Sequence, residues 1–203
     1  MSKRRYDPEA SREAILDAAE TLFAARGFGE VSTGAIAAAA GVSQSQIHYH
    51  FDTKRKLWEQ VFQRRFSAYF ARQKEMLDMA GLDDKERVAR SIPVYFAFFL
   101  ANPQFVKLLG RAQLDGIQVA QDSLSIKLMR ESSDAIARAQ KSGEIRADVR
   151  PAFVLTGFLS LVAHWFQCRD QVVLEAGLPG SPENYDSEYL DFIIKVFVRG
   201  ITP

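Results

Sequence analysis

The side chains best suited to chemistry gather in one short polar stretch. They are amides, hydroxyls and imidazoles, with little formal charge: Gln44, Ser45, Gln46, His48, Tyr49 and His50. An amide can make a bidentate contact to adenine, and a hydroxyl can reach a base edge or a phosphate. A solvated helix surface usually carries charged residues instead. The pattern therefore favours a surface that reads nucleic acid.

Two short helices joined by a tight turn are expected to position this stretch. Ser32 is a helix-capping residue type, and the alanine-rich run 35–40 after it has high helix propensity. Gly41 can take the positive φ of a tight turn without a steric penalty. Ser43 and Gln46 have the spacing of a capping box, which opens a second helix. Such a helix-turn-helix places its second helix in a DNA major groove.

Apolar spacing predicts which side of the second helix faces inward. Val42, Ile47 and Phe51 recur at five- and four-residue intervals, so they can pack with Ile36 and Ala40. The polar residues named above are then left on the outer side.

At these residues the chain resembles the tetracycline-repressor (TetR) family of bacterial transcription regulators. The matching segments are ILDAAETLFAARGF (15–28), TGAIAAAAGVS (33–43) and IHYHFDTKRKLWEQVF (47–62). The family typically shows a Leu-Tyr-Tyr-His-Phe run followed by a lysine, here Lys54, and an acidic residue. In this chain His48 replaces a tyrosine and Arg55 stands where an acidic residue is common. These two departures bear on the operator sequence and leave the expected fold unchanged.

The resemblance implies an all-α chain with two domains. Residues 1–53 would form a three-helix helix-turn-helix DNA-binding domain, and residues 54–203 a larger helical domain for ligand binding and dimerisation. A long helix that starts near residue 54 would join them. The implied function is a sequence-specific transcriptional regulator, a repressor that an apolar or aromatic inducer releases from a palindromic operator. The residues expected at the DNA are Arg5, Thr33, Gly34, Ser43, Gln44, Ser45, Gln46, His48, Tyr49, His50 and Lys54.

Hydrophobic periodicity predicts helices along the whole chain and no strand. The expected helices outside the helix-turn-helix cover residues 9–26, 54–79, 83–101, 103–112, 118–142, 151–170 and 186–199. No internal repeat or low-complexity tract interrupts them.

Aromatic residues are concentrated in the C-terminal part, which holds twelve of the 15 phenylalanines. Tyr95, Phe96, Phe98 and Phe99 surround more of a helix than one buried stripe would use. The resemblance implies a cavity for a small inducer here. Its expected lining is Phe66, Phe70, Tyr95, Phe96, Phe99, Phe105, Leu108, Phe158 and Val162. The alternative left open is that these residues fill an ordinary core.

The last two helices are expected to form a dimer interface. The penultimate one has small or modest residues on one face, and the last has an apolar stripe. The expected interface residues are Gly157, Ser160, His164, Cys168, Phe192, Ile193 and Val196. Two such helices from each subunit could make a four-helix interface. Dimerisation would set two recognition helices about 34–36 Å apart, which implies a palindromic target.

The charge distribution adds a smaller argument about DNA. Net charge is +1, and residues 1–60 contain eight basic and eight acidic side chains, so the N-terminal part has no domain-wide basic surface. The basic residues cluster at 3–5 and 54–56, on either side of the helix-turn-helix. The first cluster is expected to be an arm that follows phosphates or enters a minor groove. The resemblance assigns Lys54 to a phosphate.

Bulk properties indicate a cytoplasmic protein without a membrane span. A single cysteine excludes an intramolecular disulfide framework, and no signal-peptide pattern follows the basic residues at the start. The uncharged stretch 151–168 approaches the lower length limit of a membrane span, but it contains polar residues. It is therefore predicted to be a buried helix.

The sequence gives little support for a catalytic or metal-binding function. His48 and His50 diverge by about 200° on a helix, so they cannot share a metal. His164 and Cys168 share a face, but no further ligand lies near them in the sequence. Nucleophile-elbow, P-loop and dinucleotide motifs are missing, so no enzyme activity, cofactor or metal is expected. Two alternatives stay open: a DNA-binding regulator without a small-molecule ligand, and a helical enzyme or carrier that has lost DNA binding.

Overall fold

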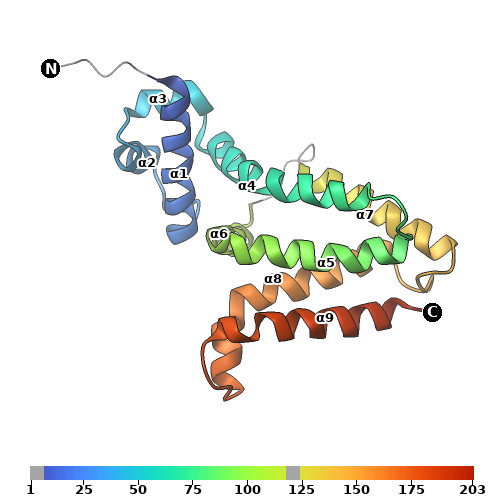
Figure 1. The fold of residues 1–203 in the computed structure, drawn as a ribbon. Coiled ribbons are helices and arrows are strands. Elements are labelled where there is room, and N and C mark those ends of the chain that lie inside the picture. The colour runs from blue at the N-terminus through green and yellow to red at the C-terminus, as the bar shows by residue number, and fades with distance from the viewer. Residues whose placement is uncertain (1–6, 118–123) are drawn as a thin grey trace. The chain divides into compact units, whose positions relative to one another are not determined.

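The computed structural model describes residues 7–117 and 124–203, and within these ranges the chain is helical with no strand. The helices, labelled in Figure 1, are α1 (Pro8–Arg26), α2 (Thr33–Ala40), α3 (Gln44–Phe51), α4 (Lys54–Leu77), α5 (Asp84–Ala101), α6 (Pro103–Leu114), α7 (Leu124–Lys141), α8 (Pro151–Glu175) and α9 (Asp186–Ile201). A short 3₁₀ helix, η1 (Pro182–Tyr185), precedes α9. The predicted all-α class is confirmed.

Local capping explains where the N-terminal helices begin and end. The Asp7 carboxylate accepts hydrogen bonds from two backbone N–H groups at the start of α1, and the Ser32 hydroxyl accepts one at the start of α2. Gly41 ends α2 with a φ of 67°, a conformation that favours glycine. The capping box of Ser43 and Gln46 opens α3 as predicted.

Three helices, α6, α8 and α9, end later than periodicity predicts, and α6 ends at Leu114 in place of residue 112. α8 continues to Glu175, beyond the expected end near residue 170, because Val172, Val173 and Leu174 keep it apolar until Gly177 takes a φ of 63°. α9 continues to Ile201. The first six residues of the helix expected at 118–142 lie outside the described ranges.

The chain divides into two compact units, which differ from a simple cut of the sequence. The first unit comprises residues 1–65 and 104–121, and the second comprises residues 66–103 and 122–203. α4 therefore contributes residues to both units, and α6 belongs mainly to the first. The functional division predicted at residues 53 and 54 stays a prediction.

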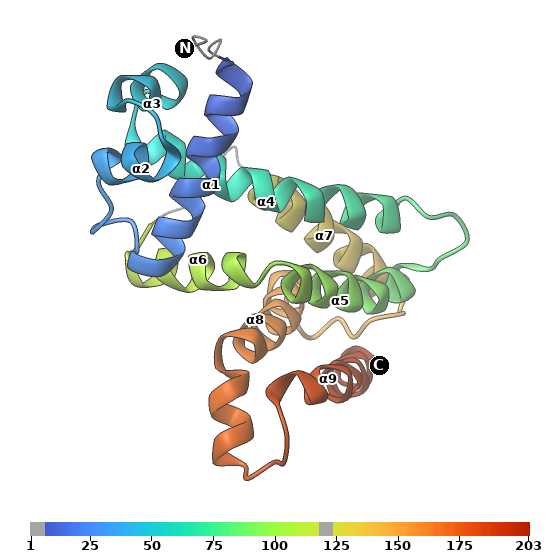
Figure 2. The same ribbon diagram turned by 60° about the vertical axis from the view of Figure 1, so that its left-hand side comes forward.

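The first unit is built on α1, against which α2 and α3 pack (Figures 1 and 2). Its interior holds Ile15, Leu16, Phe23, Ile36, Ile47, Leu57 and Trp58, all nearly inaccessible to solvent. α6 completes this core, since the ring of Phe105 lies 4.9 Å from that of Phe62. Asp115, just after α6, accepts a hydrogen bond of 2.6 Å from the Phe28 backbone N–H.

The second unit has an aromatic interior in which α5 packs against α7, α8 and α9. The centre of the Tyr95 ring lies 5.1 Å from the ring centre of Tyr69, 4.7 Å from that of Phe99 and 6.3 Å from that of Phe158. Burial raises the pKa of both phenols above the usual tyrosine value, and the neighbouring Tyr95 adds to the effect on Tyr69. Both hydroxyls therefore stay neutral at physiological pH.

α8 is long and apolar enough, by length and composition alone, to cross a membrane. The predicted buried helix is buried on one face only: 28% of its most apolar window is inside the chain. The buried side chains are Val154, Leu155, Phe158, Val162, Trp165 and Val173. Periodicity did not reveal how little of this helix its own chain covers.

Candidate functional site

The polar face of α3 is held outward by two buried anchors. Ile47 is 1% exposed and Phe51 is 4% exposed, and α3 packs against α1 and α2. On the opposite side Tyr49 is 76% exposed. Gln44, Ser45 and His48 are also exposed, while Gln46 and His50 are half-buried. Burial therefore follows the inward and outward sides that the spacing predicted.

Gln44 is fixed in direction by its neighbour on α2. Its Nε2 donates a hydrogen bond of 2.8 Å to the Thr33 hydroxyl. Gly34 lies against this contact, because a Cβ placed there would be 3.9 Å from the Gln44 Oε1. The Oε1 and the second N–H of the amide can still contact a base edge. The pair thus orients the first polar side chain of α3.

Gln46 belongs to the capping box of α3, which limits the contacts that its side chain can make with bases. Its Oε1 accepts a 2.8 Å hydrogen bond from the Ser43 backbone N–H and lies 3.1 Å from the Ser43 hydroxyl. The Ser43 hydroxyl also lies 2.9 Å from that of Ser45. A bidentate contact from Gln46 to adenine would break the capping box, so only its Nε2 can act outward. Direct contact of these residues with DNA stays a prediction.

A strained turn links α3 to α4. Asp52 has a φ of 62° and a ψ of −60°, which is rare for any residue except glycine. The Thr53 N–H donates to the Phe51 carbonyl oxygen at 2.6 Å, which closes a three-residue γ-turn. The Lys56 ammonium lies 2.7 Å from the Asp52 carboxylate. Its hydrogen bond and its charge lower the pKa of Asp52, and the same contact raises the pKa of Lys56.

His48 is oriented by the same turn. Its Nδ1 lies 3.0 Å from the Asp52 carbonyl oxygen, which can only accept, so Nδ1 carries a proton. In the neutral ring Nε2 is then an acceptor on the exposed side of the helix. A tyrosine hydroxyl can both donate and accept, so this histidine offers different hydrogen-bond chemistry at the position where it departs from the family pattern.

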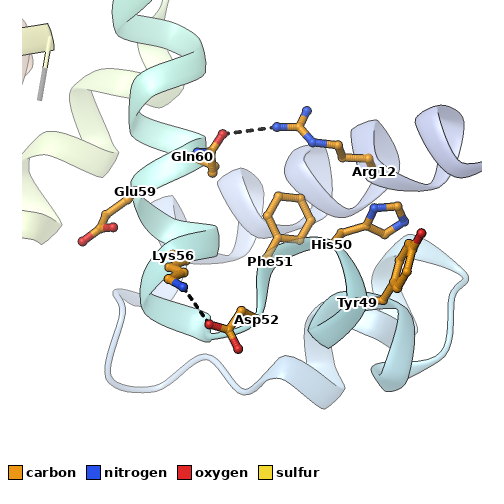
Figure 3. A pocket seen from close by; sticks show the side chains of 8 residues that line it. All are labelled: Arg12, Tyr49, His50, Phe51, Asp52, Lys56, Glu59 and Gln60. Carbon is orange, nitrogen blue, oxygen red and sulfur yellow. Dashed lines mark hydrogen bonds and ion pairs between the residues drawn. The ribbon is translucent and has the colours of Figure 1, made fainter.

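A groove of about 490 Å³ lies beside α3 and is lined by α1, α3 and the start of α4. Figure 3 shows its lining side chains, Arg12, Tyr49, His50, Phe51, Asp52, Lys56, Glu59 and Gln60. Arg12 donates to the Gln60 side chain at 3.2 Å, and its guanidinium carbon lies 5.5 Å from the centre of the Phe51 ring. The groove joins two basic side chains to the exposed Tyr49. Sequence reasoning missed Arg12, because no local pattern in α1 signals that it reaches this groove.

The Lys54 side chain forms hydrogen bonds within the first unit. Its ammonium donates hydrogen bonds to the carbonyl oxygens of Phe28 at 2.8 Å and Val31 at 3.0 Å, and it lies 4.2 Å from the centre of the Phe28 ring. It therefore braces the segment between α1 and α2. An ammonium has three donors, and its contact with phosphate stays a prediction. The expected contact from Arg5 lies outside the described residues.

Ion pairs connect α4 to α1. Arg64 contacts Glu13, Asp17 and Glu20 at 3.1, 2.9 and 2.7 Å, and Arg65 contacts Glu20 at 2.8 Å. The Glu20 carboxylate is buried, so its contacts with two guanidiniums offset the loss of hydration. The N-terminal half of α4 is thereby held against the helix that supports α3.

The residues expected to line a ligand cavity fall into two sets. Tyr95, Phe96, Phe99, Phe158 and Val162 are buried in the second unit, and Phe66 and Phe70 are half-buried there. Phe105 and Leu108 instead belong to the first unit. Their role in a common ligand site stays a prediction.

A cavity in the second unit shares only Phe158 with the predicted lining. It lies between α4, α5, α7 and α8, and the other lining residues are Gln73, Leu77, Arg87, Val88, Ser91, Ser132, Ala135, Ile136 and Leu155. The predicted ring of Tyr95 packs against those of Phe99 and Phe158 instead. No pattern of hydrophobic residues could have indicated Gln73, because it is polar and stands between the charged residues Arg72 and Lys74 of α4.

The expected dimer residues lie on α8 and α9 but differ in accessibility. Phe192 and Val196 are 49% and 52% exposed, and Ser160 and His164 are exposed as well. Ile193 is fully buried within the chain, and a Cβ at Gly157 would lie 3.3 Å from the Phe197 ring, so these two positions serve the packing of α8 on α9.

His164 Nδ1 lies 3.7 Å from Cys168 Sγ. The described residues contain no group of three or more His, Cys, Asp or Glu side chains that could hold a metal.

Comparisons with known proteins agree with this architecture. The family model for bacterial regulatory proteins of the tetR family matches residues 15–61, and the model for the tetracyclin repressor-like C-terminal domain matches residues 93–183. The HTH-type transcriptional regulator RutR of Escherichia coli O157:H7 is 27% identical over 206 residues, which cover 99% of this chain and 95% of that protein.

Solved structures show the same fold. A TetR family transcription regulator from Marinobacter aquaeolei VT8 aligns with a TM-score of 0.73 and 18% identity over 95% of this chain and 96% of that one. A gamma-butyrolactone receptor (ArpA like protein) aligns with a TM-score of 0.67 and 21% identity over 97% and 90% of the two chains. At these identities the likeness concerns the fold alone.

Proposed function

The chain belongs to the TetR family of bacterial regulatory proteins and is a helix-turn-helix transcription regulator, and we propose that it acts as a dimeric repressor of a palindromic operator. The observation that carries this proposal is the polar face of α3, with Gln44 oriented by Thr33 and Tyr49 exposed to solvent. Members of this family are generally not enzymes, and we assign this chain no catalytic step. We also place it in the cytoplasm, where its DNA target would lie.

Recognition rests on base contacts more than on bulk charge. Residues 1–60 carry equal numbers of basic and acidic side chains, so the non-specific electrostatic contribution is small. Gln44, Tyr49 and His48 Nε2 supply donors and acceptors for base edges or phosphates. Exposed apolar side chains on α8 and α9, among them Phe192 and Val196, support a dimer that presents two recognition helices to one palindrome.

Release would act through α4. This single helix starts two residues after Asp52, is held to α1 by Arg64 and Arg65, and contributes Gln73 and Leu77 to the cavity of the second unit. A ligand that favours one arrangement of α4 changes operator affinity by the ratio of its affinities for the two arrangements. The neighbour described as a gamma-butyrolactone receptor supports a small-molecule signal in this class of fold.

The packing of the aromatic core favours a second candidate, a dimeric DNA-binding regulator without a small-molecule ligand. Tyr95 contacts both Phe99 and Phe158, and the cavity that Phe158 lines is small. In that case operator affinity would not respond to any compound that binds the second unit.

In vitro selection from random duplex DNA, at low and moderate salt, tests the proposed function. We expect enrichment of one palindrome whose half-sites are about one helical turn apart. Gln44→Ala should relax the preference at one position of each half-site while the protein still dimerises. Recovery of only salt-sensitive, sequence-independent DNA would overturn the assignment of α3 as a reader.

A further inference from the structure

Gln73, on α4, is a buried amide without a full set of partners. The residue is 2% exposed, and its Oε1 is buried with no hydrogen-bond partner among the described residues. Buried polar atoms in folded proteins are nearly always paired. An apolar side chain of the same shape would avoid the cost of an unpaired oxygen, so Gln73 calls for an occupant that donates a hydrogen bond.

The surroundings of Gln73 form a mainly apolar site with few polar groups. Leu77 lies one turn further along α4, and Leu155 and Phe158 contribute apolar walls from α8. Ser91 lines the cavity from α5, and its hydroxyl already donates to the Val88 carbonyl oxygen at 2.6 Å, so toward the cavity it can only accept. Apolar walls with a few placed polar atoms are typical of small-molecule sites.

Arg87 lines both this cavity and an open groove of about 490 Å³, together with Leu77 and Ala135. Its Nη1 donates to the carbonyl oxygen of Leu77, the last residue of α4, and its Nε lies 3.5 Å from an Asp84 carboxylate oxygen. A positive side chain at this position satisfies a terminal carbonyl of the helix. Arg87 therefore lies where the groove and the cavity meet, and it contacts the end of α4.

The groove has an acidic character that selects among ligands. Its charged lining consists of Asp78, Asp84, Glu131, Asp134, Arg87 and Arg138, four carboxylates and two guanidiniums. The surplus negative charge lowers the local concentration of anions and raises that of cations.

We propose that this cavity takes a small neutral or cationic molecule with an apolar body, which donates an O–H or N–H hydrogen bond to the Gln73 side chain. The inference rests on the proposed function, since it assigns the chemistry of the ligand to which the regulator responds. In this structure the cavity has a volume of about 10 Å³, which holds about one water molecule. The displacement of Arg87 from Leu77 supplies the remaining space.

Four probes of similar shape test the proposal on the full chain: 2-phenylethanol, 2-phenylethylamine, phenylacetate and propylbenzene. Binding is measured by calorimetry and by the rise in melting temperature, without DNA. We expect the alcohol and the amine to bind about fivefold to tenfold more tightly than propylbenzene, because only they satisfy Gln73. Phenylacetate should bind most weakly.

Gln73→Met keeps the shape of the side chain and removes its hydrogen bond, so it should erase the preference for the alcohol over propylbenzene. Gln113→Leu, at an exposed position of α6, is the matched control and should leave the preference intact. Gln73→Glu places a carboxylate there and should favour the amine over the alcohol, which supplies a second test if Gln73→Met does not fold.

Equal binding of all four probes, or no binding of any, would overturn the proposal and leave a buried water as the partner of Gln73. Failure of this inference is distinguishable from failure of the proposed function, because the probes are measured without DNA and the operator is selected without a ligand. Once an operator is known, 2-phenylethanol should also weaken its complex with the wild-type protein, and the Gln73→Met complex should require a higher concentration of the alcohol for the same effect.

Discussion

The polar face of α3 and the cavity of the second unit are built in opposite ways. α3 has eight residues, two buried anchors, and polar side chains that are set by contacts within a few residues or with the start of α2. The cavity draws its walls from four helices, and the Gln73 Oε1 in it is buried without a partner among the described residues. The comparison teaches that a surface site can be assembled by local capping, whereas an interior site depends on which helix faces meet.

The largest expected effect distinguishes the buried side of α3, which stabilises the fold, from its exposed side, which is proposed to contact DNA. Phe51→Ala should reduce the free energy of unfolding by about 3–5 kcal/mol, because it empties a buried position. Tyr49→Ala changes an exposed aromatic residue on the same helix and should leave stability within about 0.5 kcal/mol. Urea titrations followed by circular dichroism give both values. If Tyr49→Ala destabilised the protein as much as Phe51→Ala, the assigned inner and outer sides of α3 would be wrong.

A smaller effect compares equivalent caps in the two units. The Ser43 hydroxyl belongs to the α3 capping box, and the Asp83 carboxylate accepts the Glu86 N–H at 2.6 Å at the start of α5. Ser43→Ala and Asp83→Ala should each reduce the free energy of unfolding by about 1 kcal/mol. Only Ser43→Ala should also weaken operator binding in a fluorescence titration, because only α3 carries the reading face. Equal losses of operator affinity would contradict a locally built site.

The smallest expected effect is a pH dependence at the turn between α3 and α4. Contact with Lys56 lowers the pKa of Asp52 below its ordinary value of 3.8, so the charged form is favoured in the folded protein. Its stabilising contribution is present above pH 3.8 and disappears as the pH falls through the lowered folded-state pKa. Urea midpoints of the wild type and Asp52→Asn should therefore differ at neutral pH and converge in acid. Parallel midpoints across the range would show that the ion pair contributes nothing.

Local sequence determined the N-terminal helices of the first unit. Gly41 takes the positive φ that its residue type favours, and Ser43 and Gln46 close the box that their spacing requires. The intervals between Ile47 and Phe51 place both on the buried side. Each of these features depends on residues within one or two turns, so helix geometry and side-chain chemistry were enough to predict them.

Only the tertiary structure decided the contacts between distant residues. Lys54 turns to the carbonyl oxygens of Phe28 and Val31, and Phe105 packs beside Phe62 in the first unit. The buried amide of Gln73 lies in a cavity that four helices line. Periodicity shows that a helix has an apolar face, but it does not specify the partner of that face. That choice depends on the packing of side chains that lie far apart in the chain.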